Sequence, residues 1–166
     1  KLGNNFFDKL NEEVTYMKER SSAEISGLEV KRAIGVRSKA VFELPIDEGF
    51  ELVKILQEEW KDSGFVPKKM DPLMFDEFYE NCEYAYEYRY FSGVCEKKLG
   101  LNSSKLQQSG ILESMINEAK KEITDFEKDV EKYRNRRDDE SKKFASNLMV
   151  KRRKLEAKKI ILEGLS

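Results

Sequence analysis

The chain has 166 residues, about the length of one domain. Charged residues make up 38% of the chain and hydrophobic residues 39%, and the latter include ten Phe and seven Tyr that can fill a core. This balance excludes a disordered chain and is typical of elongated helices, which expose much surface for each unit of core. The content of nine Gly and three Pro also favours helices, because both residues interrupt them.

The chain has no histidine. This excludes Ser–His and Cys–His nucleophile pairs, zinc sites with histidine ligands and di-iron helical bundles. The two cysteines, Cys82 and Cys95, are too few for a four-thiolate site, and on one helix they would lie about 20 Å apart, too far for a disulfide. The glycines are isolated and make no phosphate-binding loop. We therefore expect no metal ion, no cofactor and no enzymatic activity.

The first predicted helix covers residues near 5–44 and begins with Asn4 or Asn5 as its N-terminal cap. Its first apolar residues lie three and four positions apart, which places them on one face: Phe7, Leu10, Val14 and Met17. Pro45 ends this helix, because proline disfavours helical geometry in the residue before it. In an alternative interpretation residues 34–44 contain a short strand, since short apolar runs suit both structures.

The second predicted helix covers residues near 48–63. Asp47 is expected to be its N-terminal cap, and Glu48 suits the positive end of the helix dipole. Gly64 stands where a left-handed residue commonly ends a helix. The apolar face of this helix consists of Phe50, Val53, Ile55, Leu56 and Trp60.

The third predicted helix, near 72–99, has the clearest ends. Asp71 places a capping carboxylate before a proline at the first helical position, and Gly100 suits a left-handed stop. Between these ends tyrosines alternate with other residues, a period of two that suits a strand over 83–92. Apolar residues also recur there every three or four positions, so we favour a helix. The alternative is an α+β fold with strands near 34–44 and 83–92.

Residues 101–166 are predicted to form one long helix that begins with a capping box, Ser104 with Gln107. Over 112–133 the apolar residues alternate four and three positions apart, a heptad seam that buries one narrow stripe against another helix. The predicted protein interface is therefore Leu112, Ile116, Ala119, Ile123, Phe126, Val130 and Tyr133. The stripe then becomes polar and resumes out of register from Phe144, which indicates a second partner, a bend or an exposed stretch.

A basic cluster lies between residues 141 and 159, where eight bases accompany one acid. Such a charge suits nucleic acid or an anionic membrane, although aromatic side chains that would stack on bases are nearly absent. A solvated helix face is the structural alternative. The candidate anion-binding residues are Lys142, Lys143, Lys151, Arg152, Arg153, Lys154, Lys158 and Lys159.

One segment is an exception to the expected absence of enzymatic activity. Carboxylates and tyrosines crowd residues 80–90, where an acidic, aromatic pocket could raise the pKa of a carboxyl group and make it a general acid. A helix of this composition more often marks the boundary between core and solvent, or an interface. The residues concerned are Glu80, Glu83, Glu87, Tyr84, Tyr86 and Tyr88.

The sequence thus predicts an all-α fold, with a helical bundle in residues 1–100 packed on part of a long, coiled-coil-like helix in 101–166. We expect a non-enzymatic scaffold or adaptor, whose partner is a second copy or another coiled-coil subunit, and no small-molecule substrate. Two cysteines without a framework, and no apolar run of about 20 residues, suit an intracellular protein of the cytoplasm or nucleus. The chain begins with Lys rather than Met, which suits an excerpt or a processed product.

Overall fold

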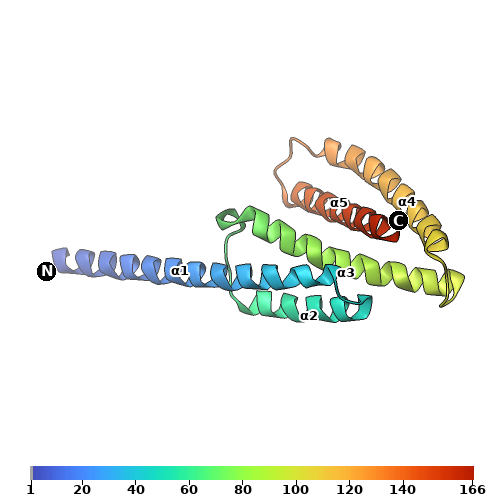
Figure 1. The fold of residues 1–166 in the computed structure, drawn as a ribbon. Coiled ribbons are helices and arrows are strands. Elements are labelled where there is room, and N and C mark those ends of the chain that lie inside the picture. The colour runs from blue at the N-terminus through green and yellow to red at the C-terminus, as the bar shows by residue number, and fades with distance from the viewer. Residues whose placement is uncertain (1) are drawn as a thin grey trace.

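The computed structural model describes residues 2–166, with side chains from Asn4 onward. Within that range the chain has five α-helices, two short 3-10 helices and no strand (Figure 1). The helices are α1 (Leu2–Ser38), η1 (Lys39–Phe42), α2 (Ile46–Asp62), η2 (Lys68–Met70), α3 (Pro72–Leu99), α4 (Lys105–Lys132) and α5 (Asp139–Leu165). The all-α prediction is confirmed, and the α+β alternative is wrong: residues 34–44 end α1 and form η1, and 83–92 lie inside α3.

Several helix ends follow the predicted signals. The Asp71 carboxylate accepts a hydrogen bond from the backbone N–H of Met74 at 3.3 Å, which caps α3. Ser104 and Gln107 form the reciprocal capping box at the start of α4. Asp47 is not the cap of α2, because the helix already begins at Ile46 and Asp47 lies in its first turn, where its charge still suits the helix dipole.

The C-terminal half of α1 packs with α2 and the first half of α3 around one hydrophobic core (Figure 1). Trp60 of α2 lies at its centre, stacked on Phe78 with ring centroids 4.0 Å apart and edge-on to Phe75 at 5.1 Å. Beside it Val53 and Leu56 are fully buried. The Ser38 hydroxyl, also buried, accepts a hydrogen bond from the Asn81 amide at 2.9 Å and thereby ties the end of α1 to α3.

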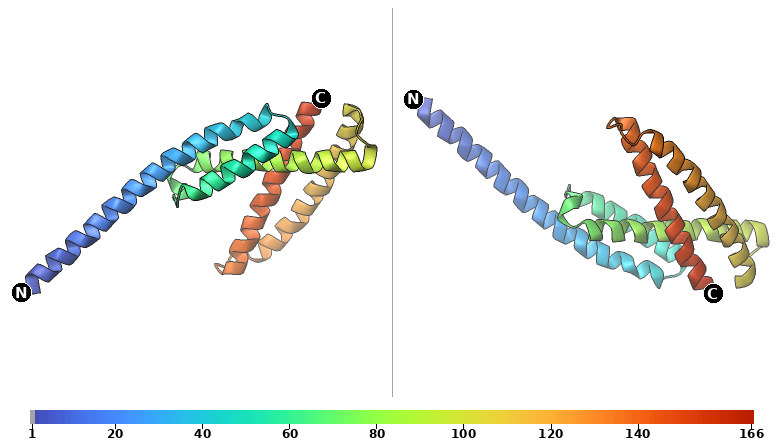
Figure 2. Two further views of the ribbon diagram at one scale, coloured as in Figure 1. Left: turned by 90° about the horizontal axis from the view of Figure 1, so that it is seen from below. Right: turned by 90° about the horizontal axis from the view of Figure 1, so that it is seen from above.

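The single long helix predicted for 101–166 is wrong, because residues 133–138 form a turn between α4 and α5. The two helices lie antiparallel as a hairpin that crosses α3 (Figure 2). Asp138 caps α5 by accepting from the backbone N–H of Ser141 at 2.9 Å. Across the turn Tyr133 stacks on Phe144, with ring centroids 4.8 Å apart. The polar stretch that interrupts the apolar seam after Tyr133 is therefore the turn at which the chain reverses direction.

The heptad seam of residues 112–133 lies inside this hairpin. Leu112, Ile116 and Ile123 are buried, and Ala119, Phe126 and Val130 pack partly buried against the same core. Their neighbours come from α5 and from the second half of α3: Leu148, Leu155, Ile161, Leu165, Phe91 and Cys95. The seam predicted as a protein interface thus meets helices of its own chain.

Among residues 2–166, no helix is both long enough and apolar enough to cross a lipid bilayer.

Both cysteines are free and buried in α3. Burial raises the pKa of the Cys82 thiol to about 12 and also raises the pKa of Cys95. Because the thiolate is the reactive form, neither cysteine should react with a thiol reagent such as Ellman's reagent at pH 8 in the folded protein, and both should react after unfolding in urea. Rapid reaction of either thiol in the native protein would contradict this packing.

Candidate functional site

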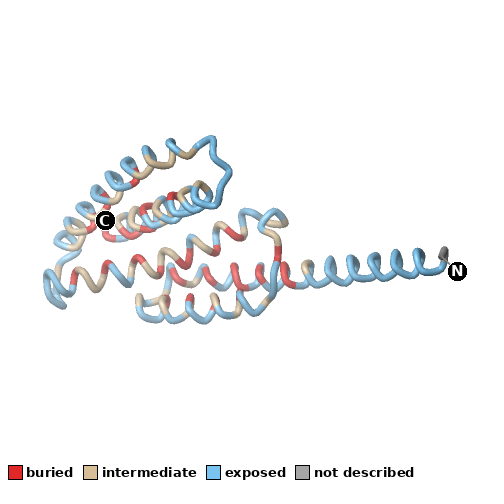
Figure 3. Tube along the Cα trace, turned by 180° about the vertical axis from the view of Figure 1, so that it is seen from behind, coloured by how far each residue is buried: buried red, intermediate tan, exposed pale blue. Residues whose placement is uncertain are grey.

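The first half of α1 projects away from the rest of the molecule (Figure 1). Every residue from 4 to 23 is exposed, as the unbroken pale blue of this segment in Figure 3 shows. At 1.5 Å per residue these residues make a rod about 30 Å long. An isolated helix of this length is marginal in water, and this one contains several weak helix formers, among them Asn11, Thr15 and Ser21.

Four large apolar side chains form a stripe on this projecting helix. Phe7 is 63% exposed, Leu10 44%, Val14 42% and Met17 69%. Their three–four–three spacing places them on one face. We call this set the α1 stripe. Apolar side chains are common singly on surfaces, but a row of four along one helix face is typical of a surface that another helix covers.

The same helix face becomes part of the protein's own core farther along α1. Continuing the heptad from the α1 stripe leads through Ser21 and Glu24 to Leu28 and Lys31, which are both buried against the rest of the three-helix bundle. One face of α1 is therefore covered by its own chain in the second half and uncovered in the first. The two polar positions mark the boundary between the halves.

Lys31 anchors α1 where it enters the bundle. Its ammonium donates to the carbonyl of Trp60 at 2.6 Å and to the Ser63 hydroxyl at 2.7 Å, and it lies 4.6 Å from the centre of a Trp60 ring. Burial lowers the pKa of this lysine. The contacts place a positive charge at the C-terminal end of α2, which the helix dipole favours, and they fix the direction in which the free half of α1 leaves the bundle.

The basic cluster is mostly engaged within the chain. Five of its eight residues contact side chains of α3, α4 or α5: Lys151 with Glu122, Arg152 with Glu127, Arg153 over the ring of Tyr79, Lys158 with Glu87, and Lys159 with Glu156. Among residues 4–166, no ion pair involves Lys142, Lys143 or Lys154. Two of these contacts join α5 to α3, two join it to α4 and one lies within α5, so the cluster does not form one free basic face.

The pair between Lys158 and Glu87 is the most enclosed of these contacts. The two groups lie 2.8 Å apart, and their side chains are only 12% and 10% exposed. A buried ion pair adds little net stability, but removing one partner leaves an unpaired charge in the interior.

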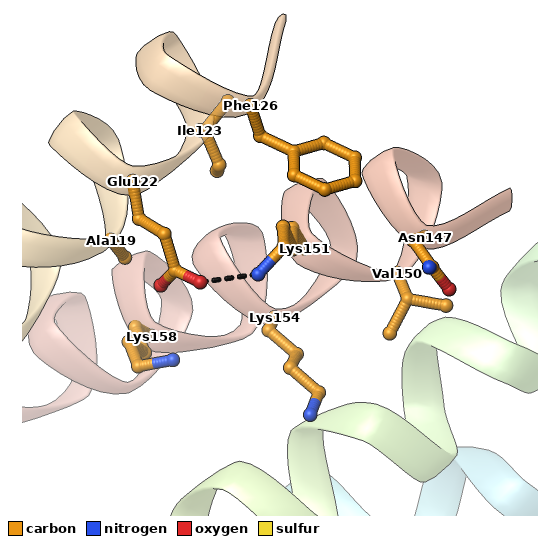
Figure 4. Close-up of a pocket in the computed structure, with 9 residues that line it drawn as sticks. All are labelled: Ala119, Glu122, Ile123, Phe126, Asn147, Val150, Lys151, Lys154 and Lys158. Atoms are coloured by element: carbon orange, nitrogen blue, oxygen red, sulfur yellow. Dashed lines mark hydrogen bonds and ion pairs between the residues drawn. The ribbon is translucent and has the colours of Figure 1, made fainter. Parts of the chain in front are cut away.

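A cavity of about 520 Å³ lies between α4 and α5 (Figure 4). Lys151, Lys154 and Lys158 line one side of it. Ile123 and Phe126 supply apolar wall from α4. Glu122 also belongs to α4, and Figure 4 shows that its carboxylate accepts a hydrogen bond from the Lys151 ammonium. The hydrogen bond from Lys151, together with the positive charge of the three lysines, lowers the pKa of Glu122.

The tyrosines and carboxylates of residues 80–90 do not converge on one pocket. Glu87 is paired with Lys158, Tyr86 donates to the Gln57 side chain, and Tyr90 is exposed. Burial raises the pKa of Glu83, and the nearby charge of Glu87 raises it further. Within the described residues no group of three or more metal-binding side chains is gathered.

The chain matches no family model, no curated protein and no solved structure.

The α1 stripe is a candidate interface that the sequence pattern alone did not indicate. The spacing of Phe7, Leu10, Val14 and Met17 was visible, but the same spacing is typical of a core-facing helix. A signal was available in Ser21 and Glu24, which interrupt the stripe before the buried Leu28.

Replacing Lys158 with Gln should lower the free energy of unfolding by about 3 kcal/mol, because Glu87 would stay buried without its partner. Replacing Lys159, whose pair with Glu156 is exposed, should change it by less than about 0.5 kcal/mol. Urea denaturation of both variants measures the difference. Equal effects would mean that the Lys158 pair is as hydrated as the surface pair.

Replacing Glu83 with Gln should stabilise the protein at pH 7. The raised pKa of Glu83 means that its contribution to stability is complete below its ordinary pKa of 4.5 and is lost as the pH rises through the raised value. Urea denaturation from pH 4 to 7 should show a flatter pH dependence for the variant than for the wild type. Replacing Glu80, an exposed carboxylate of the same helix, with Gln is the control and should not stabilise the protein at pH 7. A variant less stable than wild type at pH 7 would contradict the assignment.

Proposed function

We propose that this protein is a non-enzymatic helical assembly subunit that pairs through the α1 stripe with the same stripe of a second copy. The observation that carries this proposal is the row of four exposed apolar side chains, Phe7, Leu10, Val14 and Met17, on a helix that leaves its own bundle. Mutual burial would cover both rows at once. It would also give the projecting helix the partner that a segment of this length needs in water.

The apolar area of the α1 stripe suits a dimer of moderate affinity. Burying a large apolar side chain is worth about 2 kcal/mol, and these side chains are roughly half exposed, so eight of them in a dimer contribute about 8 kcal/mol. Association itself costs about 4–15 kcal/mol in lost freedom. We therefore expect a dimer that dissociates on dilution.

The charges beside the α1 stripe favour a parallel pair. With Phe7 and Val14 as one set of seam positions, Glu13 of one copy faces Lys18 of the second copy, and the reverse pair forms as well. An antiparallel pair that aligned the same stripes would set Glu13 against Glu13 of the second copy, which is unfavourable. The two helices would separate near Ser21, where the apolar stripe ends.

The alternative, a basic module for nucleic acid or an anionic membrane, has less support. Five of the eight basic residues already contact side chains of the same chain, so fewer charges are available for phosphates. We also propose an intracellular location, in the cytoplasm or nucleus, which two buried free thiols suit.

Replacing Leu10 and Val14 with Glu should abolish self-association, because charged side chains would then face each other at the centre of the seam. Sedimentation equilibrium across a range of concentrations should give the wild type a mass that rises towards twice 19.5 kDa and the double variant a constant 19.5 kDa. Replacing Tyr16, which is 65% exposed and off the stripe, with Glu is the control and should leave the association intact.

Orientation can be tested by replacing Leu10 with Cys. In a parallel pair the two new thiols lie opposite each other at the seam and should form an intermolecular disulfide under mild oxidation, whereas in an antiparallel pair they do not meet. Cys82 and Cys95 should form no intermolecular disulfide because they are buried. A wild type that is monomeric at every concentration would overturn self-association and leave a different helical subunit as the partner to be sought.

A further inference from the structure

The cavity between α4 and α5 combines charged and apolar side chains, and none of its lining residues comes from α1 (Figure 4). Lys151, Lys154 and Lys158 stand at positions i, i+3 and i+7, which places them on one face of α5. The only carboxylate among the residues that line the cavity is Glu122 of α4. Lys158 is already paired with Glu87 of α3, so Lys151 and Lys154 are the lysines of this lining that can bind an added anion.

The lysines differ in how free they are to meet a ligand. Lys158 is held by Glu87 of α3 at 2.8 Å and is almost enclosed. Lys154 is exposed and makes no ion pair with any residue of 4–166, although Glu83 of α3 lies near enough for their charges to interact. Lys151 is bonded to Glu122, whose side chain is 64% exposed. A second anion could therefore bind Lys154 directly and compete with Glu122 for Lys151.

The opposite side of the cavity is apolar. Ile123 and Phe126 from α4 line it, and the Lys151 ammonium lies 5.3 Å from the centre of the Phe126 ring. A simple inorganic ion would leave this wall in contact with water. The cavity therefore suits an anion that carries an apolar group.

We propose that this cavity binds a phosphate monoester with an apolar substituent. Its phosphate would lie between Lys151 and Lys154, and its substituent against Ile123 and Phe126. A phosphate monoester carries close to two negative charges at neutral pH, one for each of the two lysines that would bind it. Lysine binds phosphate as a point charge, so two lysines suit a dianion better than a singly charged carboxylate.

Phenyl phosphate is the probe, titrated into the full chain at low salt and followed by calorimetry. Saturable binding with one ligand per chain is expected. Replacing Lys154 with Gln should weaken it at least tenfold, and replacing Glu122 with Gln should tighten it several-fold, because the competing carboxylate is removed. Replacing Lys143, an exposed lysine of the same helix outside the cavity, with Gln is the matched control and should leave affinity unchanged.

Two further probes test the parts of the ligand. Inorganic phosphate should bind at least tenfold more weakly than phenyl phosphate, because it cannot use the apolar wall. Vesicles of phosphatidic acid, compared with vesicles of phosphatidylcholine, distinguish a lipid headgroup from a free phosphate ester. Binding to the phosphatidic acid vesicles that is lost with Lys154→Gln would name the lipid as the source, and phenyl phosphate binding without vesicle binding would name a free ester.

The proposal fails if phenyl phosphate shows no saturable binding at millimolar concentration. It also fails if inorganic phosphate binds equally well, or if Lys143→Gln weakens binding as much as Lys154→Gln does, because the attraction would then be general to the basic surface. Circular dichroism controls for folding, and the spectrum should not change because Lys154 and Glu122 are both exposed.

Discussion

An apolar face on a helix has to be covered, and α1 has such a face covered along only half of its length. In the second half, Leu28 and Lys31 lie against the bundle, and the lysine fixes the helix to the end of α2 through Trp60 and Ser63. In the first half the same face carries the α1 stripe, which stays exposed to solvent among residues 4–166. The proposed assembly follows from this difference, because the anchored half directs the free half away from the bundle formed by the described residues (Figure 1).

The rest of the molecule is arranged around α3, which serves two hydrophobic cores. Its first half supplies Phe75 and Phe78 to the core shared with α1 and α2, and its second half supplies Phe91 and Cys95 to the core shared with α4 and α5. Charged contacts such as Lys158 with Glu87 add to the apolar ones where the hairpin crosses α3. Most of the basic cluster thus contacts side chains of its own chain, and Lys154, which makes no ion pair with residues 4–166, lines the cavity.

Much of the fold could be predicted because its signals are local. The capping groups Asp71 and Ser104 act on backbone groups three residues away, so their effect can be read from the sequence. The reversal at residues 133–138 was missed because a heptad pattern shows that a stripe must be covered and does not show whether the cover is another chain or the next helix. Asp138, an N-terminal cap followed by two more acids, was the signal that a new helix begins there.

The candidate sites depend on contacts that no local pattern reveals. The lysines of α5 look alike in the sequence, and only the packing of α3 and α4 pairs Lys158 and leaves Lys154 available. In the same way, Phe7 and Leu28 occupy equivalent helix positions, but only Leu28 is buried. The loop after α2 packs closely against α1 at Gly27, next to Leu28, and among residues 4–166 no such contact reaches Phe7.

Hydrogen–deuterium exchange of residues 4–23 at several protein concentrations tests the central claim most directly. If the α1 stripe pairs with a second copy, backbone amides around Leu10 and Val14 should exchange more slowly as the concentration rises, while amides near Trp60 in the bundle stay equally protected throughout. Fast exchange of residues 4–23 that is the same at every concentration would contradict the account.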